Sequence, residues 1–184
     1  MQIILTHENA DFDAIASLLG AYKLYPNATP VLPRRLNRNV KAFINLYQTE
    51  LPFVDVQYLP PEKIESVILV DTKNLVTLKG MVENPVVQVV DHHEFHEDTP
   101  VSWSVVNEKV GACTTLFVES LTGHNGFVNA IHATLLLLGI YEDTGSLTYV
   151  STTSRDVRAA AYLLDHGASL QIAADYLNPP LSED

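Results

Sequence analysis

Cysteine and basic residues are both scarce in this chain of 184 residues. The single cysteine, Cys113, can form no internal disulfide and cannot supply a cysteine-rich zinc site. This usage favours a reducing compartment, so we expect a cytoplasmic protein. The chain has 11 Lys and Arg residues and 22 Asp and Glu residues, which gives a formal net charge of -11. Such a surface repels phosphate groups and disfavours duplex binding through a basic face, whereas a carboxylate cluster that binds divalent metal fits it.

Long apolar segments and targeting signals are missing as well. The most apolar helical stretch, residues 133–141, is shorter than the ~20 residues needed to span a bilayer. Met1 and Gln2 lead directly into apolar residues, without the charged start and cleavage site of a signal peptide. We therefore expect a protein that is neither secreted nor inserted in a membrane.

The composition favours one compact domain, because 47% of the residues are hydrophobic and no internal repeat is present. We expect this domain to cover residues 1–177. An Asn-Pro-Pro sequence follows, which ends the last expected helix. Residues 178–184 are therefore predicted to begin a linker to a missing C-terminal domain.

Short β-branched runs alternate with helical patterns along the chain, which is typical of βα units and a mostly parallel sheet. The predicted fold class is α/β, with a mostly parallel sheet of about five strands and helices on both faces. Strand-like runs occupy residues 2–6, 29–32, 54–58, 67–70 and 86–90, and the sequence turns helical after residues 102–106. Helical patterns occupy residues 13–24, 39–47, 112–121, 128–141, 155–165 and 170–177.

Groups able to bind metal follow three of these strands and one helix. They are His7, Asp11 and Asp13 after the first strand, Asp71 after VILV, Asp91, His92 and His93 after VVQVV, and Asp143 after the apolar helix, with Glu142 as its neighbour and competitor. Taken singly, each has an ordinary explanation as a helix cap or turn residue. Together they would place uncompensated charge at the carboxyl edge of the sheet, where ligands bind in such folds. This arrangement is costly unless metal ions neutralise it, so the sequence predicts a metal centre.

These residues resemble the DHH phosphoesterases, metal-dependent hydrolases of phosphoric esters and anhydrides that are named for the tripeptide Asp91-His92-His93. Four motifs occur in the order typical of that family, over nearly the whole chain. The first motif and its surroundings are most similar to one subgroup of that family, by the sequence HENADFDAIASLLGAYKLYPNATPVLP. In this subgroup the domain is the N-terminal part of a longer protein and is followed by CBS modules and a tRNA nucleotidyltransferase or poly(A) polymerase-like domain. Many family members carry Pro and Gly where this chain has Ala10 and Phe12, which leaves open the shape of the pocket beside Asp13.

The resemblance implies two divalent cations. The residues implied for the first are His7, Asp11 and Asp71, and those for the second are Asp13, Asp71, His92 and Asp143, so that Asp71 bridges both. Imidazole and carboxylate ligands suit Mn²⁺ or Mg²⁺, and Mn²⁺ is expected first. Two cations about 3.5–4 Å apart would activate a shared water.

The resemblance also implies a catalytic set of His93, Asp71 and Asp91. His93 is expected to donate a hydrogen bond to the scissile phosphate and so to contact substrate. Asp91 is expected to orient the two imidazoles of the tripeptide.

A basic segment offers a second contact for a phosphorylated substrate. Arg34 and Arg35 lie with Arg38 and Lys41 between a strand and a helix, where they could bind phosphates or simply form a solvated helix face. The start of the next helical pattern, residues 111–115, could likewise present backbone N–H groups to an anion or only pack closely.

The expected function is hydrolysis of phosphoester bonds of nucleotides or short oligonucleotides by a water activated between two metals. The domain would form the N-terminal part of a larger RNA nucleotidyltransferase, and it would turn over weakly without the C-terminal domains of the same chain. Two alternatives stay open: a manganese inorganic pyrophosphatase, and a non-catalytic regulatory or ligand-sensing module. The sequence indicates no oligomeric state.

Overall fold

The computed structural model describes residues 1–94, 99–123 and 128–177, so the expected linker lies outside the described residues. The strands are β1 (Gln2–Leu5), β2 (Thr29–Leu32), β3 (Val54–Asp55), β4 (Ile64–Val70), β5 (Met81–Asp91) and β6 (Ser104–Asn107). The α-helices are α1 (Phe12–Leu24), α2 (Arg38–Tyr47), α3 (Cys113–Gly123), α4 (Ala130–Thr144), α5 (Ser154–Asp165) and α6 (Leu170–Leu177). A short 3-10 helix, η1 (Val56–Tyr58), follows β3.

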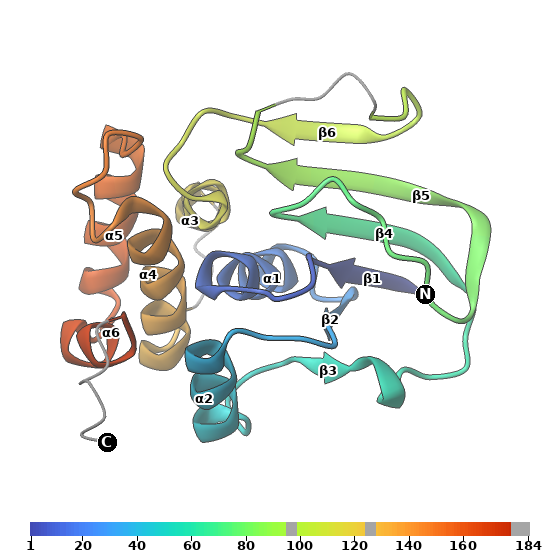
Figure 1. The fold of residues 1–184 in the computed structure, drawn as a ribbon, viewed down its shortest axis with the longest axis horizontal. Coiled ribbons are helices and arrows are strands. Elements are labelled where there is room, and N and C mark those ends of the chain that lie inside the picture. Colours follow the sequence, from blue (N-terminus) through green and yellow to red (C-terminus); the bar gives the residue numbers. More distant parts are fainter. Residues whose placement is uncertain (95–98, 124–127, 178–184) are drawn as a thin grey trace.

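The strands form one sheet in the order β3-β2-β1-β4-β5-β6, and all five neighbouring pairs are parallel (Figure 1). The predicted α/β class and parallel sheet are confirmed, with six strands in place of five. The additional strand, β6, pairs with β5 at one edge and ends beside Asp91. The order in which successive strands are added reverses between β1 and β4. From β1 the chain continues to β2 on one side of the sheet, and from β4 it continues to β5 on the other side. Ligands bind at such a switch point, outside the carboxyl ends of the strands.

Alternation along the central strands gives the sheet two buried faces. Ile4, Ile68 and Val90 belong to the larger apolar cluster, which also contains the buried residues of all six α-helices. Ile3 and Leu69 point to the opposite face, whose smaller cluster is covered by residues of η1 and of the segment after Asp71. The α-helices therefore pack on one face, whereas the only helix among the described residues over the other face is the short 3-10 helix η1, so the prediction of helices on both faces is corrected in this respect. The connection from β4 to β5 is residues 71–80, which is shorter than the dozen or more residues that a helical crossover needs.

Close helix contacts bring α1 and α4 together beneath the carboxyl edge of the sheet. A Cβ atom added at Gly139 of α4 would lie 2.6 Å from the Cβ of Ala16 in α1. The helices cross so closely that their backbones fix each other's position. Helix α4 continues to Thr144, where Gly145 adopts the left-handed conformation typical of a helix end. Asp143 thus lies in the last turn of α4, and the expectation that it follows the helix is wrong.

A buried carboxylate fastens α5 to this layer. Asp156 is fully buried and accepts hydrogen bonds from the backbone of Gly111 and Thr153 and from the hydroxyl of Thr115. These bonds outweigh the effect of burial, which would raise its pKa, and hold the pKa of Asp156 below the ordinary value.

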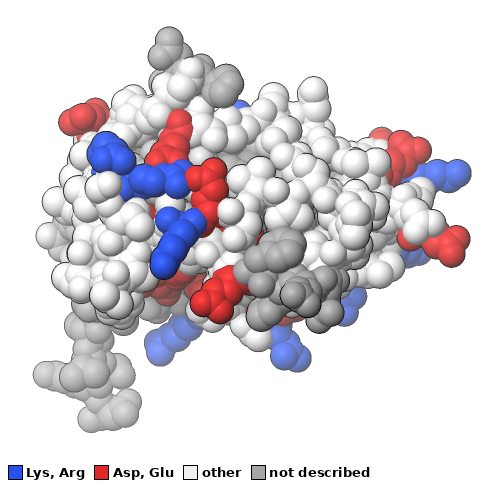
Figure 2. Space-filling model, turned by 90° about the horizontal axis from the view of Figure 1, so that it is seen from above, with Lys and Arg blue, Asp and Glu red and all other residues white. Residues whose placement is uncertain are grey.

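Charged side chains of both signs share the surface. Figure 2 shows one face on which Lys and Arg side chains lie against Asp and Glu side chains and form no separate basic patch. Arg155, for example, pairs with Glu108 at 2.6 Å and with Glu119 at 2.5 Å. Among the described residues, the longest apolar helices fall short of what a membrane span requires.

Candidate metal centre

His7 and Asp11 reach the carboxyl edge of the sheet from the loop between β1 and α1. The side chain of Asp11 caps α1 by accepting a hydrogen bond from the Ala14 N–H at 3.0 Å. The Nδ1 atom of His7 donates to the carbonyl of Glu8 at 3.0 Å, so that Nε2 faces the acids. This Nε2 atom lies 3.3 Å from a carboxylate oxygen of Asp71 and 4.0 Å from one of Asp11. The hydrogen bond to Asp71 raises the pKa of His7 to about 9.

Asp71 occupies the centre of the cluster, directly after β4. Its φ angle is +55°, a left-handed conformation that non-glycine residues adopt at a cost and that recurs at functional sites. The side chain is buried, and burial raises its pKa. One carboxylate oxygen faces His7, whereas the other, Oδ1, is buried and lacks a hydrogen-bond partner among the described residues.

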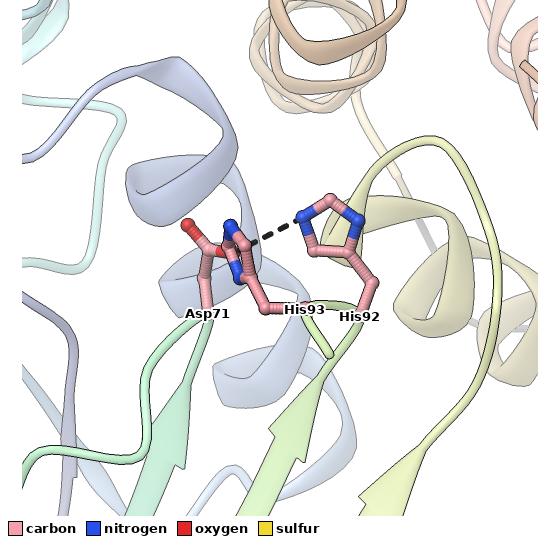
Figure 3. Close-up of side chains that lie close together, drawn as sticks. All are labelled: Asp71, His92 and His93. Carbon is pink, nitrogen blue, oxygen red and sulfur yellow. Dashed lines mark ion pairs between the residues drawn. The ribbon is translucent and has the colours of Figure 1, made fainter. Parts of the chain in front are cut away.

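His92 follows β5 and points at Asp71, as the dashed line in Figure 3 shows. Its Nδ1 atom donates to the carbonyl of Val110 at 3.2 Å, so that Nε2 faces the acids. Nε2 lies 3.4 Å from Asp143, 3.5 Å from Oδ1 of Asp71 and 3.7 Å from Asp13. Burial lowers the pKa of His92, but the three carboxylates outweigh it and raise the pKa to about 9. Nε2 is also buried without a hydrogen-bond partner within the part of the chain that the structure describes.

Asp13 lies in the first turn of α1 and is completely buried. Its two oxygens accept hydrogen bonds from the N–H groups of Cys113 and Thr114, at 2.7 and 2.8 Å, where α3 begins. The anion at this helix N-terminus is therefore the protein's own carboxylate. Despite these bonds, burial and the charges of Asp71 and Asp143 raise the pKa of Asp13 well above its ordinary value.

Asp91 and His93 form a hydrogen-bonded pair at the edge of this cluster, where Nδ1 of His93 also lies 3.6 Å from Oδ1 of Asp71. The carboxylate of Asp91 accepts hydrogen bonds from the backbone N–H groups of His92 and His93 and from Nδ1 of His93, the last at 2.8 Å. Burial favours a raised pKa for Asp91, but these bonds outweigh it and lower the pKa to about 2. The imidazole of His93 remains 61% exposed. Its ring is thus oriented by Asp91 and open to the cavity.

Lys73 is a contributor that sequence reasoning missed. Its ammonium group donates to the carbonyls of His93 and Glu94, at 3.1 and 2.6 Å, and lies 3.6 Å from Asp91. It thereby ties the segment after β4 to the loop that carries the tripeptide. The available signal was its position two residues after Asp71, in a chain with few basic residues.

Glu142, the competitor of Asp143, has another role. Its carboxylate accepts a hydrogen bond from the backbone N–H of Phe12 at the start of α1, and burial raises its pKa to about 7.

Phe12 turns away from the metal-binding groups, because its ring packs against Phe43 and Tyr176 at centroid distances of 6.0 and 6.1 Å. Like Phe12, Ala10 is buried. Neither residue lines the cavity beside the cluster, so the departures from the usual motif leave that cavity intact.

We call this cavity, on the carboxyl edge of the sheet, the rim cavity; its volume is 480 Å³. Its lining includes His7, Asp11, Asp71, Asp91, His93 and Asp143. Three groups of side chains around it have ligand atoms close enough to share an ion: His7, Asp11 and Asp71; Asp13, His92 and Asp143; and Asp71, His92 and His93. The first two groups match the expected sets, apart from the bridging position of Asp71 in the second. Oδ1 of Asp71 and Nε2 of His92, which lack hydrogen-bond partners among the residues described, fit divalent cations together with the excess of carboxylates.

Arg34 and Arg35 are not part of this cluster. Both side chains are exposed, and neither residue lines the rim cavity. Their backbone N–H groups instead donate to the carboxylate of Glu8, at 3.4 and 3.1 Å. Their expected contact with substrate phosphate stays a prediction.

Comparison with known families agrees with the geometry. The model of the DHH family, N-terminal domain, matches residues 2–140, and the chain belongs to this family. An A-adding tRNA nucleotidyltransferase of Geobacter sulfurreducens is 35% identical over 191 residues, which cover 100% of this chain and 22% of that protein. The bifunctional oligoribonuclease and PAP phosphatase NrnA of Mycoplasma genitalium is 31% identical, with 96% of this chain and 56% of that protein covered.

Two further similarities were found, one in sequence and one in fold. A probable manganese-dependent inorganic pyrophosphatase of Brevibacillus brevis is 31% identical over 89% of this chain and 54% of its own length. The crystal structure of an exopolyphosphatase-related protein from Bacteroides fragilis superposes with a TM-score of 0.71 at 18% identity, over 99% of this chain and 57% of that one. The chain thus spans between about a fifth and just over half of the curated relatives described.

Proposed function

We propose that this domain hydrolyses phosphoester bonds of nucleotides or short oligonucleotides at a pair of divalent cations. The observation that carries the proposal is the facing pair of buried atoms, Oδ1 of Asp71 and Nε2 of His92, which lie 3.5 Å apart and have no hydrogen-bond partner in the described parts of the chain. Two buried polar atoms without partners are costly, and a shared cation would satisfy both.

The side chains would divide between two sites. His7, Asp11 and Asp71 would hold one cation, and Asp13, Asp71, His92 and Asp143 the other. Carbonyl acceptors on Nδ1 of both histidines keep Nε2 available as the ligand atom. Mn²⁺ suits this mixture of nitrogen and oxygen ligands better than Mg²⁺, which prefers oxygen and keeps several waters.

Cations bound there would lower the pKa of a water and neutralise charge on the phosphoryl group. The protein's own contribution is to place the remaining groups. Asp91 holds Nδ1 of His93, so that the exposed imidazole can donate a hydrogen bond to a phosphate oxygen where negative charge accumulates. Lys73 holds the backbone of the same loop. The leaving oxygen departs as the water oxygen bonds to phosphorus, and no covalent enzyme intermediate is needed.

The choice of nucleotide substrates rests on the relatives. One is described as an oligoribonuclease and PAP phosphatase, and another as a tRNA nucleotidyltransferase. We infer that this domain is cytoplasmic and forms the N-terminal part of a longer RNA nucleotidyltransferase. In that protein, further domains of the same chain would cover the rim cavity, so the domain by itself would turn over weakly.

The test is hydrolysis with Mn²⁺ by this chain and by the longer protein, using dinucleotides, PAP and pyrophosphate. Asp71→Asn and His92→Gln should each lower hydrolysis at least about 100-fold. Asp55→Asn is the matched control, because Asp55 is exposed at the far edge of the sheet and should leave the rate unchanged.

The rival functions give different results in the same assay. Preferred cleavage of pyrophosphate would assign the domain to the pyrophosphatases. An absence of hydrolysis for all substrates, in both the chain and the longer protein, would refute the proposal and favour a regulatory module.

A further inference from the structure

A second cavity, which we call the β1–β2 cavity, lies at the carboxyl ends of β1 and β2 and has a volume of 190 Å³. It lies on the face of the sheet that lacks α-helices, below the segment that joins β4 to β5. Its walls include Leu5, Val31, Leu32, Val56, Val76 and Leu78.

The larger part of the wall is apolar, and four polar residues also contribute to it. Pro33, Thr6, Thr77, Glu8 and Arg34 complete the lining. The carboxylate of Glu8 is held in place by the backbone N–H groups that follow β2, and the hydroxyl of Thr6 is buried without a partner among the described residues. Apolar walls with a small number of fixed polar groups are typical of sites that hold an aromatic ring.

The two cavities adjoin along two segments of chain. Thr6 lines the β1–β2 cavity, and His7, the next residue, lines the rim cavity. Likewise, residues 72–74 line the rim cavity and residues 76–78 line the β1–β2 cavity. Both cavities therefore lie at the carboxyl edge of the sheet, with lining residues that neighbour one another in the sequence.

We infer that the β1–β2 cavity binds the nucleobase of a nucleotide whose phosphate occupies the rim cavity. This inference rests on the proposed function and adds a base-recognition site to it. Pockets for whole drug-sized ligands measure about 300–1,000 Å³, so this smaller cavity suits one ring system. Arg34 is exposed at its edge, where a guanidinium can stack on a base. Pyrophosphate has no group that would use such a cavity.

The first experiment fills the cavity. Val76 is 43% exposed, so Val76→Phe should fold normally and occupy the space with its ring. The matched control is Val86→Phe, at a residue that is 72% exposed on β5 and lines neither cavity. With a dinucleotide, Val76→Phe should raise KM by about 10-fold or more and change kcat little. With the analogue that carries an abasic sugar in place of the bound nucleoside, it should change neither constant.

The second experiment is independent of hydrolysis. Adenosine, which has no phosphate, is titrated into the metal-free protein while the amide resonances of Thr6 and Thr77 are followed by NMR. Shifts that disappear in Val76→Phe and persist in Val86→Phe support the base site, even if no phosphoester is cleaved. Normal hydrolysis with equal KM values in both variants, together with unchanged resonances, would overturn the inference and leave the proposed function standing.

Discussion

Lys73 contacts the loop that carries His93, although it lies outside the predicted ligand set. Its ammonium group holds two backbone carbonyls of the loop that carries His93. We expect Lys73→Met to lower kcat by about 10-fold to 100-fold, because His93 would lose its fixed position relative to the phosphate. The affinity for Mn²⁺ should hardly change, since the carbonyls that Lys73 holds belong to His93 and Glu94, which are outside the two expected ligand sets.

Steady-state kinetics and calorimetric titration with Mn²⁺ check this prediction together. Lys73→Arg should recover part of kcat, because a guanidinium can still donate to the same carbonyls. A uniform loss of Mn²⁺ affinity and of thermal stability in Lys73→Met would instead indicate a purely structural role.

His132 gives a pH dependence that is separate from the metal centre. It is buried on α4, where Nε2 donates to the carbonyl of Glu50 at 2.7 Å and Nδ1 has no partner among the described residues. Burial is the largest cause of its lowered pKa; the carbonyl and charge of Glu50 oppose this effect, and the charge of Lys23 adds to it. The unfolded chain, with the ordinary value of 6.5, therefore binds the proton more readily than the folded protein.

The contribution of neutral His132 to stability is thus fully present above pH 6.5 and is lost as the pH falls through the lower folded pKa. His132→Gln keeps a donor near Glu50 and removes this titration. The difference in unfolding free energy between wild type and His132→Gln, measured with urea from pH 7.5 to 5, should move in favour of the variant as the pH falls. A difference that stays constant would contradict the prediction.

At the level of helices, the crossing of α1 and α4 depends on Gly139. A Cβ atom there would come within 2.6 Å of Ala16 and of the Thr114 hydroxyl. We expect Gly139→Ala to destabilise the protein by about 1–3 kcal/mol, because α4 must move away from α1. The same movement displaces Asp143, so Mn²⁺ affinity should also fall.

Gly123→Ala is the matched control for that substitution. Gly123 lies at the end of α3, and an added Cβ atom would meet nothing within 4 Å. Alanine favours a helix over glycine, so this variant should be as stable as the wild type or slightly more so. Urea unfolding of both variants decides the matter, and equal stabilities would show that the helices can separate without cost.

The elements also show what the sequence can and cannot predict. The apolar runs predicted the positions of the strands well, because a parallel sheet buries both faces and needs continuous apolar residues. The strand ends then placed His7, Asp71 and His92 at one edge. The predicted C-terminal end of α4 came too early, because Asp143 and Thr144 continue the helix in spite of their polarity and Gly145 ends it.

Contacts between distant segments were beyond such reasoning. No local pattern reveals that the N–H groups at the start of α3 bind Asp13, 100 positions earlier in the chain. The same holds for Lys73, whose role depends on the path of a loop 20 positions away. The short β6 strand escaped the predicted count because only four residues pair at the edge of the sheet.

For the molecule as a whole, the acidic balance predicts a strong response to metal. Without cations, the carboxylates at the carboxyl edge repel one another, and this repulsion destabilises the folded state. Mn²⁺ at about 100 times its dissociation constant should contribute about 2.7 kcal/mol, which corresponds to a rise in Tm of roughly 5–10 °C. Scanning calorimetry with Mn²⁺ and then with excess EDTA measures the rise and its reversal.

Asp71→Asn supplies the control for this measurement. The metal-free variant should be at least as stable as the wild type, since it removes a buried charge, and Mn²⁺ should no longer raise its Tm. If the variant kept the full rise in Tm, the cations would have to bind elsewhere on the protein.

The wide spacing of the clustered side chains along the chain has a consequence for biosynthesis. Asp13 meets Cys113 across 100 positions, and Phe12 meets Glu142 across 130. A nascent chain on the ribosome therefore lacks part of this cluster until α4 has emerged, some way past two thirds of the domain. Binding of the proposed cations would therefore wait until most of this domain has been synthesised.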